Sequence, residues 1–269
     1  MSILDKKRSQ VMNIEYVLIL IAVALTGIRI YLGIKTPLFL QADAGYDDFL
    51  FIRYAESLLK GEWLGAFGSI ALVKSASYSM LLVIGYLLGI SYSVALTVGY
   101  IFAVFLFVKS LSKLFNNRYF DICLYIFLIY SPTMFHEENV QKVYRGGYIV
   151  IFALLTIASV IGLYTRVNEE RKKVIGWSIL GCICLPLFWF LKEDSIWILP
   201  FVIVGNILTL IEMWKSKETI KRFVKHALIV ILPVLCLGLS IVSYKAINYH
   251  YYGEYTVTDR SGTYYKEVI

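Results

Sequence analysis

Charged residues are scarce in this chain of 269 residues: Asp, Glu, Lys and Arg make up 17%, whereas apolar residues make up 59%. A water-soluble domain usually carries roughly 25% charged residues. The mean hydropathy of +0.70 indicates long stretches that lipid must cover. The shortage of charge excludes a disordered chain, a collagen and a secreted soluble enzyme. The sequence therefore predicts an integral membrane protein.

The chain also has only four cysteines, and they form no metal-binding or disulfide pattern. All of them lie inside apolar runs, without CxxC or another zinc spacing: Cys123, Cys182, Cys184 and Cys236. Cys182 and Cys184 are two residues apart and cannot share a helix face. We interpret the four as small core hydrophobes, which leaves the redox compartment open.

Positive charge exceeds negative charge by seven, with 26 Lys and Arg against 19 Asp and Glu. In a membrane protein such an excess usually anchors cytoplasmic loops. No aromatic and basic module is present, so we expect no nucleic-acid partner. No internal repeat or low-complexity linker divides the chain, which favours a single module over residues 1–269. Two alternatives stay open at the C-terminal end: a complete protein, or the N-terminal part of a longer one.

Seven apolar runs are predicted to cross the membrane as helices: 14–34, 92–108, 120–135, 148–164, 174–191, 196–214 and 227–244. The first is longer than the roughly 7–15 apolar residues of a cleavable signal, so we expect an uncleaved span. Arg29 lies near its outer end, where we expect the side chain to snorkel. The run 120–135 is the shortest, about 24 Å of helix at 1.5 Å per residue.

An eighth apolar stretch, 78–90, decides the topology. It has fewer than the ~20 residues that a helix needs to cross. If it does not cross, four short segments with 15 Lys and Arg residues lie on one side; if it crosses, 12 of these change sides. The positive-inside rule favours the first arrangement. We therefore predict seven spans, a cytoplasmic N-terminus and a juxtamembrane helix over 78–90, with an inverted eight-span chain as the alternative.

This topology places four stretches on the outer face: the loop 35–91, the turns 136–147 and 192–195, and the tail from 245. Of the 19 acidic residues, 12 then lie outside, several of them at helix ends around one rim. Ionisable residues at such depth are costly and usually mark a site. We therefore expect the functional site at this outer rim.

The first outer loop contains the pattern of an amphipathic helix over 47–61. Its apolar residues share one face at helical spacing: Phe51, Tyr54, Ala55 and Leu58. Gly61 follows as a C-terminal stop. Asp47 and Asp48 open the helix, where carboxylates complement the macrodipole. From these residues alone two interpretations stay open: the two aspartates only start a helix, or they belong to a site.

Asp47-Asp48, followed by Arg53-Tyr54-Ala55-Glu56, Gly61-Glu62-Trp63 and then Lys74, resembles the first periplasmic loop of GT-C glycosyltransferases. The nearest likenesses are the lipid A aminoarabinose transferase and the protein O-mannosyltransferases. In those enzymes an acidic pair follows the first span, and a later lysine opens a juxtamembrane helix. The resemblance covers nearly the whole chain. It implies an all-α polytopic membrane protein, a GT-C-like module of about seven transmembrane helices with juxtamembrane helices in the first outer loop.

The resemblance also implies an activity: transfer of a sugar from a polyprenyl-phosphate donor to a lipid, glycan or protein acceptor outside the bacterial plasma membrane. Asp47 is then the candidate base that takes the acceptor's proton, with Asp48 as its helper or alternative. Lys74 is the candidate ligand of the lipid phosphate. The alternative for Lys74 is a snorkelling interfacial lysine.

Two departures from the family pattern weaken these assignments. Val73-Lys74-Ser75-Ala76 lacks the prolines and the preceding Glu of the family motif. In the next outer loop, Arg145 is followed by Gly146 and Gly147, where the aminoarabinose transferase has an acidic residue. Arg145 nevertheless remains a candidate phosphate ligand at an outer helix end.

A third charged stretch, Lys192-Glu193-Asp194, separates two apolar spans. Charges between facing helices need either water or a ligand. One interpretation is a tight turn in which Asp194 or Ser195 caps the next helix. The other places Glu193 or Asp194 beside the substrate, with Lys192 in the same site. Both stay open.

The sequence predicts no certain cofactor. His136-Glu137-Glu138 is not an HExxH motif, and no metal cluster can be assembled from the three histidines. Some GT-C enzymes use a divalent cation on outer carboxylates and others do not, so a cation stays an open alternative. Two other function classes also stay open. One is a lipid or solute transporter or flippase subunit, which charges at helix ends rather than mid-bilayer disfavour; the other is a non-catalytic assembly protein.

Overall fold

The computed structural model describes residues 3–39, 47–68, 70–215 and 220–259, and this part of the chain is all-helical. The α-helices are α1 (Ile3–Lys35), α2 (Asp47–Lys60), α3 (Ser77–Leu87), α4 (Tyr92–Phe115), α5 (Arg118–Ile129), α6 (Glu137–Val140), α7 (Gly146–Arg166), α8 (Arg171–Leu191), α9 (Leu199–Lys215) and α10 (Ile220–Tyr252). Short 3-10 turns cover Pro132–Met134 and Ser195–Ile198. Within these residues, six helical segments are long and apolar enough to cross a membrane, namely α1, α4, α7, α8, α9 with the turn before it, and α10. The predicted all-α fold is therefore confirmed, and the six apolar helices are compatible with a multi-pass membrane protein.

The predicted seventh span is not confirmed, because α5 is only 12 residues long, about 18 Å at 1.5 Å per residue. The apolar run continues beyond it, but Pro132 disfavours the helical conformation at the residue before it. Ser131 accordingly has an extended ψ of 131°. The predicted helix over 120–135 therefore ends at Ile129, and a short 3-10 turn follows.

Arg29 packs against this break in α5 and does not snorkel, so that expectation is wrong. Its side chain is buried, donating from Nε to the carbonyl of Ile129 (3.2 Å) and from Nη2 to that of Met134 (2.9 Å). The guanidinium also lies 4.4 Å from the ring centroid of Phe135. Carbonyls at a helix end have no partner in the helix and favour a cation. Arg29 therefore supplies the donors that the interrupted helix lacks.

Replacing Arg29 by leucine is expected to destabilise the protein by about 2–4 kcal/mol, because buried carbonyls lose charged donors. Thermal melting of the detergent-solubilised protein measures the effect. Leu32→Ala on the exposed side of α1 is the matched control and should change little. An unchanged melting temperature in Arg29→Leu would contradict the assigned role.

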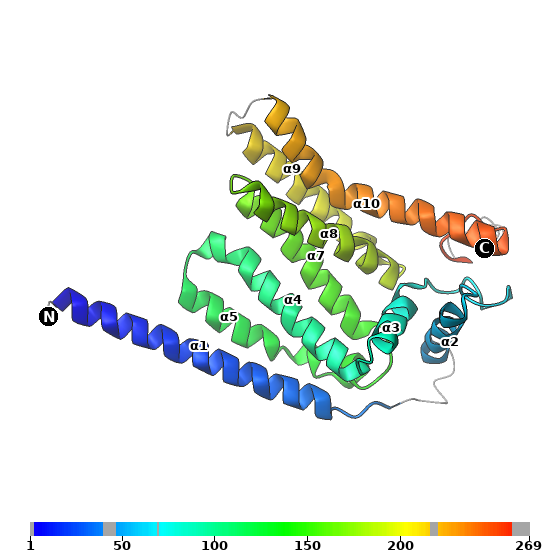
Figure 1. The fold of residues 1–269 in the computed structure, drawn as a ribbon, viewed down its shortest axis with the longest axis horizontal. Coiled ribbons are helices and arrows are strands. Elements are labelled where there is room, and N and C mark those ends of the chain that lie inside the picture. The colour runs from blue at the N-terminus through cyan, green and yellow to red at the C-terminus, as the bar shows by residue number, and fades with distance from the viewer. Residues whose placement is uncertain (1–2, 40–46, 69, 216–219, 260–269) are drawn as a thin grey trace.

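Contacts at both ends of the bundle show that α4 and α7 run parallel. At one end the rings of Tyr92 and Tyr148 lie 5.9 Å apart, and at the other Arg166 donates to the carbonyl of Ser110 (3.2 Å). Because α4 and α7 run parallel, the chain from α5 to α6 must return from one end of the bundle to the other. Figure 1 shows this short return beside α4.

The helices α8 and α10 also run parallel. Ser178 donates to the carbonyl of Ile229 (2.6 Å) near one end, and the rings of Phe190 and Tyr244 stack at 4.9 Å near the other. The helix α9 connects them and packs against α7. A small residue permits the close approach of α8 and α10: a Cβ on Gly181 would lie 2.9 Å from Pro233.

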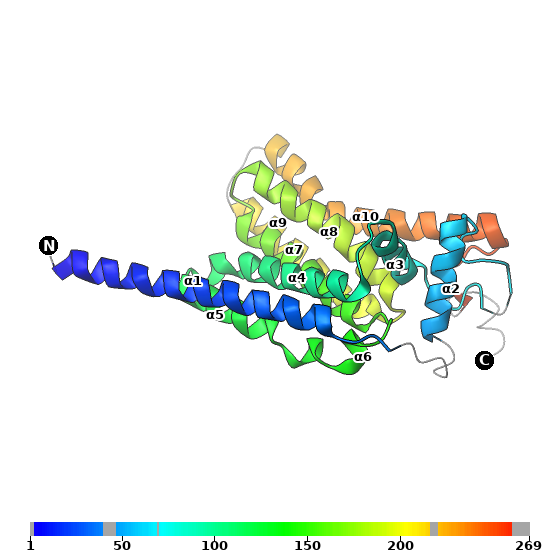
Figure 2. The ribbon, with the colours of Figure 1, turned by 60° about the horizontal axis from the view of Figure 1, so that its bottom comes forward.

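The bundle therefore has two chemically different ends. At the basic end, Lys113 of α4 pairs with Glu169 in the α7–α8 turn (2.7 Å), and Arg118 at the start of α5 pairs with Glu15 of α1 (2.8 Å). The loop end consists of α2, α3, α6 and the C-terminal part of α10. Figure 2 shows α2 lying across this end, far from the N-terminus.

The two helices predicted in the first loop are confirmed. The helix α2 buries Phe51 and Tyr54 and ends just before Gly61, whose φ of 77° favours glycine because it has no Cβ. The helix α3 has 11 residues, too few to cross, and packs against α2 and α8. Together they cover the loop end of the bundle.

Candidate functional site

Three of the predicted site residues meet at the loop end of the bundle, although they come from three separate segments. The Lys74 ammonium lies 3.5 Å from Oε1 of Glu193, and Nη1 of Arg145 lies 3.1 Å from Oε2 of the same carboxylate. The two cationic side chains are 9% and 6% exposed, and the Glu193 side chain is 27% exposed. One half-buried carboxylate is therefore held between two buried cations.

Arg145 is positioned by the turn that precedes α7. Its Nη1 also donates to the carbonyl of Leu191 at the end of α8 (3.0 Å). The guanidinium carbon lies 5.7 Å from the ring centroid of Phe51 on α2. Its Nε is buried without a hydrogen-bond partner. Arg145 therefore has a free N–H for a further acceptor. Such an acceptor would also remove the energetic cost of a buried, unused donor.

Lys74 is positioned by the loop between α2 and α3. The next two residues attach this loop to the helices behind it, since Ser75 donates its hydroxyl to the carbonyl of Phe190 and the Ala76 N–H donates to the Tyr244 hydroxyl (2.8 Å). Lys74 is therefore buried and paired with Glu193. It does not snorkel towards the surface, which was the alternative interpretation.

The same loop is attached to α10 by a contact that the sequence analysis missed. The indole N–H of Trp63 donates to Asn248 (2.8 Å), whose amide in turn donates to the carbonyl of Thr256 (2.7 Å). Trp63 has a positive φ of 56°, which is unfavourable for a bulky residue and is maintained by this network. Nothing in the local sequence pattern links positions so far apart.

The environment of Glu193 keeps it ionised. Burial alone would raise the pKa of its carboxyl group. A hydrogen bond with its own backbone N–H, together with Arg145 and Lys74, outweighs that effect, and the net pKa is below its usual 4.5. Glu193 is therefore a carboxylate at neutral pH, and its charge partly neutralises the two cations.

Glu193→Gln is expected to lower the melting temperature at pH 7, because Lys74 and Arg145 then face each other without an anion. Since the folded-state pKa of Glu193 is lowered, this stabilisation is present above the unfolded pKa and lost as the pH falls through the folded one. The melting temperatures of the wild type and the variant should therefore begin to converge as the pH falls below 4.5. Asp194→Asn is the control, and a difference in melting temperature that does not shrink as the pH falls below 4.5 would contradict the assignment.

The two candidate catalytic residues lie at the start of α2. Asp48 is buried, on the same helix face as Phe51. The side chain of Asp47 lies outside the described part of the structure, although its backbone begins α2. Burial raises the pKa of the nearby Tyr78 hydroxyl well above 10.0, and Tyr92, Tyr148 and Asp48 raise it further. Asp48 is thus beside a tyrosine that stays protonated.

Lys192 and Asp194 are not part of this buried cluster. They form an exposed ion pair (2.9 Å) with side chains 46% and 65% exposed. Asp194 precedes the turn Ser195–Ile198 but makes no capping hydrogen bond, and Ser195 instead donates to the carbonyl of Phe188 (3.0 Å). The capping interpretation is therefore wrong, and of the three charges in this turn only Glu193 points inward.

A hollow of about 360 Å³ opens beside Glu193, between α8, α10 and the segments that pack on them. Its lining combines polar with apolar side chains: Ser75, Trp189, Phe190, Lys192, Glu193, Ile241, Lys245, Val257 and Thr258. Its two lysines and the neighbouring Lys74–Glu193 pair give it a basic wall. Such a cavity suits an anionic group attached to an apolar or sugar moiety.

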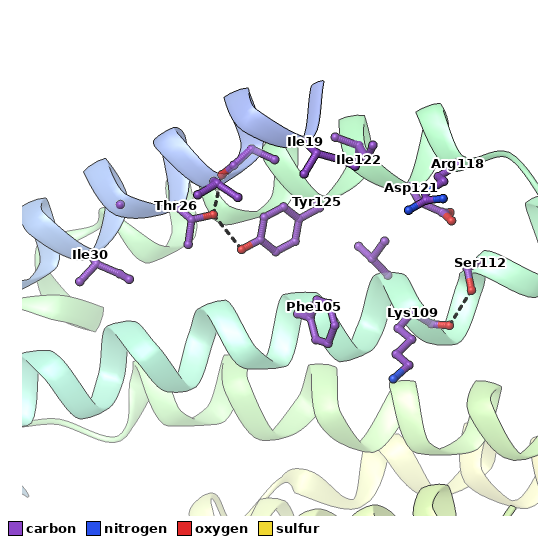
Figure 3. A pocket seen from close by; sticks show the side chains of 14 residues that line it. Ile19, Thr26, Ile30, Phe105, Lys109, Ser112, Arg118, Asp121, Ile122 and Tyr125 are labelled. Carbon is purple, nitrogen blue, oxygen red and sulfur yellow. Dashed lines mark hydrogen bonds between the residues drawn. The ribbon is translucent and has the colours of Figure 1, made fainter. Parts of the chain in front are cut away.

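A larger hollow, about 710 Å³, lies between α1, α4 and α5 and contains none of the predicted site residues (Figure 3). Most of its lining is apolar, and Thr26 is hydrogen-bonded to Tyr125 within it (2.9 Å). The charged side chains Lys109, Arg118 and Asp121 gather towards the basic end. This lining offers little to a polar solute in the middle of the bundle.

Within the described residues, no group of three His, Cys, Asp or Glu side chains is arranged to hold a metal ion. Among known proteins, no family model matches the chain, and neither a curated protein nor a solved structure is significantly similar to it. The likeness to GT-C enzymes therefore stays a prediction from the loop motifs.

Proposed function

We propose that this chain is a membrane glycosyltransferase of the GT-C type, which moves a sugar from a polyprenyl-phosphate donor to a lipid, glycan or protein acceptor. The observation that carries the proposal is the convergence of Lys74 and Arg145 on one carboxylate beside a hollow at the loop end. Arg and Lys side chains are common ligands of phosphate groups, so two buried cations side by side suit a phosphate. The unpartnered Nε of Arg145 adds a donor for a phosphate oxygen.

In this proposal Glu193 forms ion pairs with Lys74 and Arg145 until the donor binds. The donor phosphate then takes hydrogen bonds from Lys74 and Arg145, and Asp47, with Asp48 as helper or alternative, accepts the proton of the acceptor hydroxyl or amine. The acceptor atom bonds to the anomeric carbon, and the bond from that carbon to the phosphate oxygen breaks. Lys74 and Arg145 offset the negative charge of the departing polyprenyl phosphate.

The proposal includes a topology: α5 and the segment after it complete a seventh crossing, and the loop end is extracytoplasmic. Its support is the parallel course of α4 and α7 and the concentration of Lys and Arg at the basic end. A cysteine placed at Ser112 should resist an impermeant thiol reagent added outside intact cells. A cysteine placed at the exposed Phe67 of the loop end is the control and should react, and the reverse pattern would overturn the topology.

The activity is tested by reconstituting the purified protein with a radiolabelled polyprenyl-phosphate sugar and an extract of candidate acceptors. Release of polyprenyl phosphate with transfer of the label supports the proposal. Labelled donor that crosses the bilayer intact would instead identify a transporter or flippase. The same assay with and without EDTA decides whether a divalent cation takes part.

A further inference from the structure

A third hollow, about 470 Å³, lies at the basic end, remote from the candidate site. Its lining comes from α4, α7, α8 and the turn between α7 and α8: Leu106, Lys109, Lys113, Arg166, Glu169, Lys173, Gly176, Trp177 and Leu180. Four of these side chains are cationic and one is a carboxylate, which leaves an excess of positive charge. The proposed transferase chemistry uses none of them.

The charges of this hollow are held in place by the fold. Glu169 bridges Lys113 (2.7 Å) and Lys173 (3.1 Å), which joins α4 to α8. Arg166 is buried, donating to the carbonyls of Lys109 and Ser110, and its guanidinium lies 5.1 Å from the ring of Trp177. The bridging carboxylate shows where the site accepts an anion, and each lysine ammonium has three donors to share.

The lining also changes from basic to apolar in one direction. The helix α4 ends here. Its Leu106 lies about one turn deeper in the bundle than Lys109 and about two turns deeper than Lys113. On α8, which begins here, Leu180 lies about two turns deeper than Lys173. Both walls therefore place cations at the end of the bundle and apolar side chains beneath them. A phospholipid, with its phosphate above its acyl chains, has the same order.

We propose that this hollow binds an acidic glycerophospholipid, with its phosphate beside Lys109, Lys113 and Lys173 and an acyl chain along Leu106 and Leu180. Basic pockets between membrane helices commonly bind anionic lipid headgroups. The net positive charge selects an acidic lipid over a zwitterionic one. This site is independent of the proposed sugar transfer, since it lies at the opposite end of the bundle.

The test is native mass spectrometry of the full chain with phosphatidylglycerol or phosphatidylcholine of the same acyl chains. We expect retention of phosphatidylglycerol, and about thirtyfold weaker binding in Lys113→Gln/Lys173→Gln, because each lysine near an anionic lipid contributes a roughly fivefold preference. Lys35→Gln/Lys60→Gln removes two exposed lysines elsewhere and should bind like the wild type. These paired variants separate a specific site from general attraction to a basic protein.

Gly176 provides a second variant that leaves the charges intact. A Cβ at this position would meet no atom within 4 Å, so Gly176→Leu should fold and project into the hollow. We expect it to lose phosphatidylglycerol as well. Equal retention of the two lipids, unchanged binding in either hollow variant, or full displacement by millimolar glycerol phosphate, which would indicate a small-anion site, would each overturn the proposal.

Discussion

Asp47→Asn is expected to lower sugar transfer by about 10²–10⁴-fold, the usual contribution of a positioned general base, while donor binding stays near the wild-type level. Asparagine starts a helix about as well as aspartate, so α2 should form in the variant. The measurement is the release of polyprenyl phosphate by the reconstituted protein, compared with donor retention in a binding assay. A loss of transfer with donor binding intact would assign chemistry, and not folding, to Asp47.

Asp48→Asn and Glu56→Gln complete this experiment. Asp48 is buried at the same helix start, whereas Glu56 is exposed on the same helix. If Asp48 is the base, its variant shows the larger loss and Asp47→Asn remains active. Glu56→Gln should transfer at the wild-type rate. Full activity in both aspartate variants would exclude the acidic pair from catalysis and leave it as a helix start.

The sequence predicted the local elements well, because their signals are local. The helical spacing of Phe51 and Tyr54 predicted the buried face of α2, and Gly61 predicted its end. The stretch 78–90 proved too short to cross, as expected, and became α3. Periodicity, length and a single glycine carry this information without reference to the rest of the chain.

The failures involve contacts between distant segments or competition between local rules. Hydropathy extended the third predicted span to residue 135, but Pro132 ended α5 earlier. Arg29 was expected at the interface because its own helix gives no sign of the carbonyls that it reaches about 100 residues away. The hydrogen bond from Trp63 to Asn248 likewise could not be predicted from the sequence. Such pairings depend on how helices pack, and helix packing leaves no periodic trace in one sequence.

The candidate site shows the same division. Lys74, Arg145 and Glu193 were each singled out from their own segment, but no pattern stated that one carboxylate bridges the other two. Lys192, Glu193 and Asp194 looked equivalent in sequence, yet only Glu193 faces inward. The end of α8 decides this difference, because Arg145 binds both the Leu191 carbonyl and Glu193. The side chains on either side of Glu193 instead pair with each other and are 46% and 65% exposed.

Lys74→Gln is expected to weaken donor binding by about 10–150-fold, because a buried charged hydrogen bond to the phosphate contributes about 1.5–3 kcal/mol. Lys74→Arg should retain most of the affinity, and Lys60→Gln, which removes an exposed lysine at the end of α2, should change it little. The dissociation constant is measured with a fluorescent polyprenyl phosphate in detergent micelles.

Glu193→Gln distinguishes a phosphate ligand from a merely structural lysine. If Lys74 only pairs with Glu193 (3.5 Å), removing either partner disturbs the same contact, and both variants should weaken donor binding alike. If Lys74 binds the phosphate, Glu193 competes with the donor for it. Its removal then leaves donor binding unchanged or tighter, measured where the variant stays folded. We therefore expect weaker donor binding in Lys74→Gln and unchanged or tighter donor binding in Glu193→Gln. Equal losses of affinity in the two variants would show that Lys74 has only a structural role.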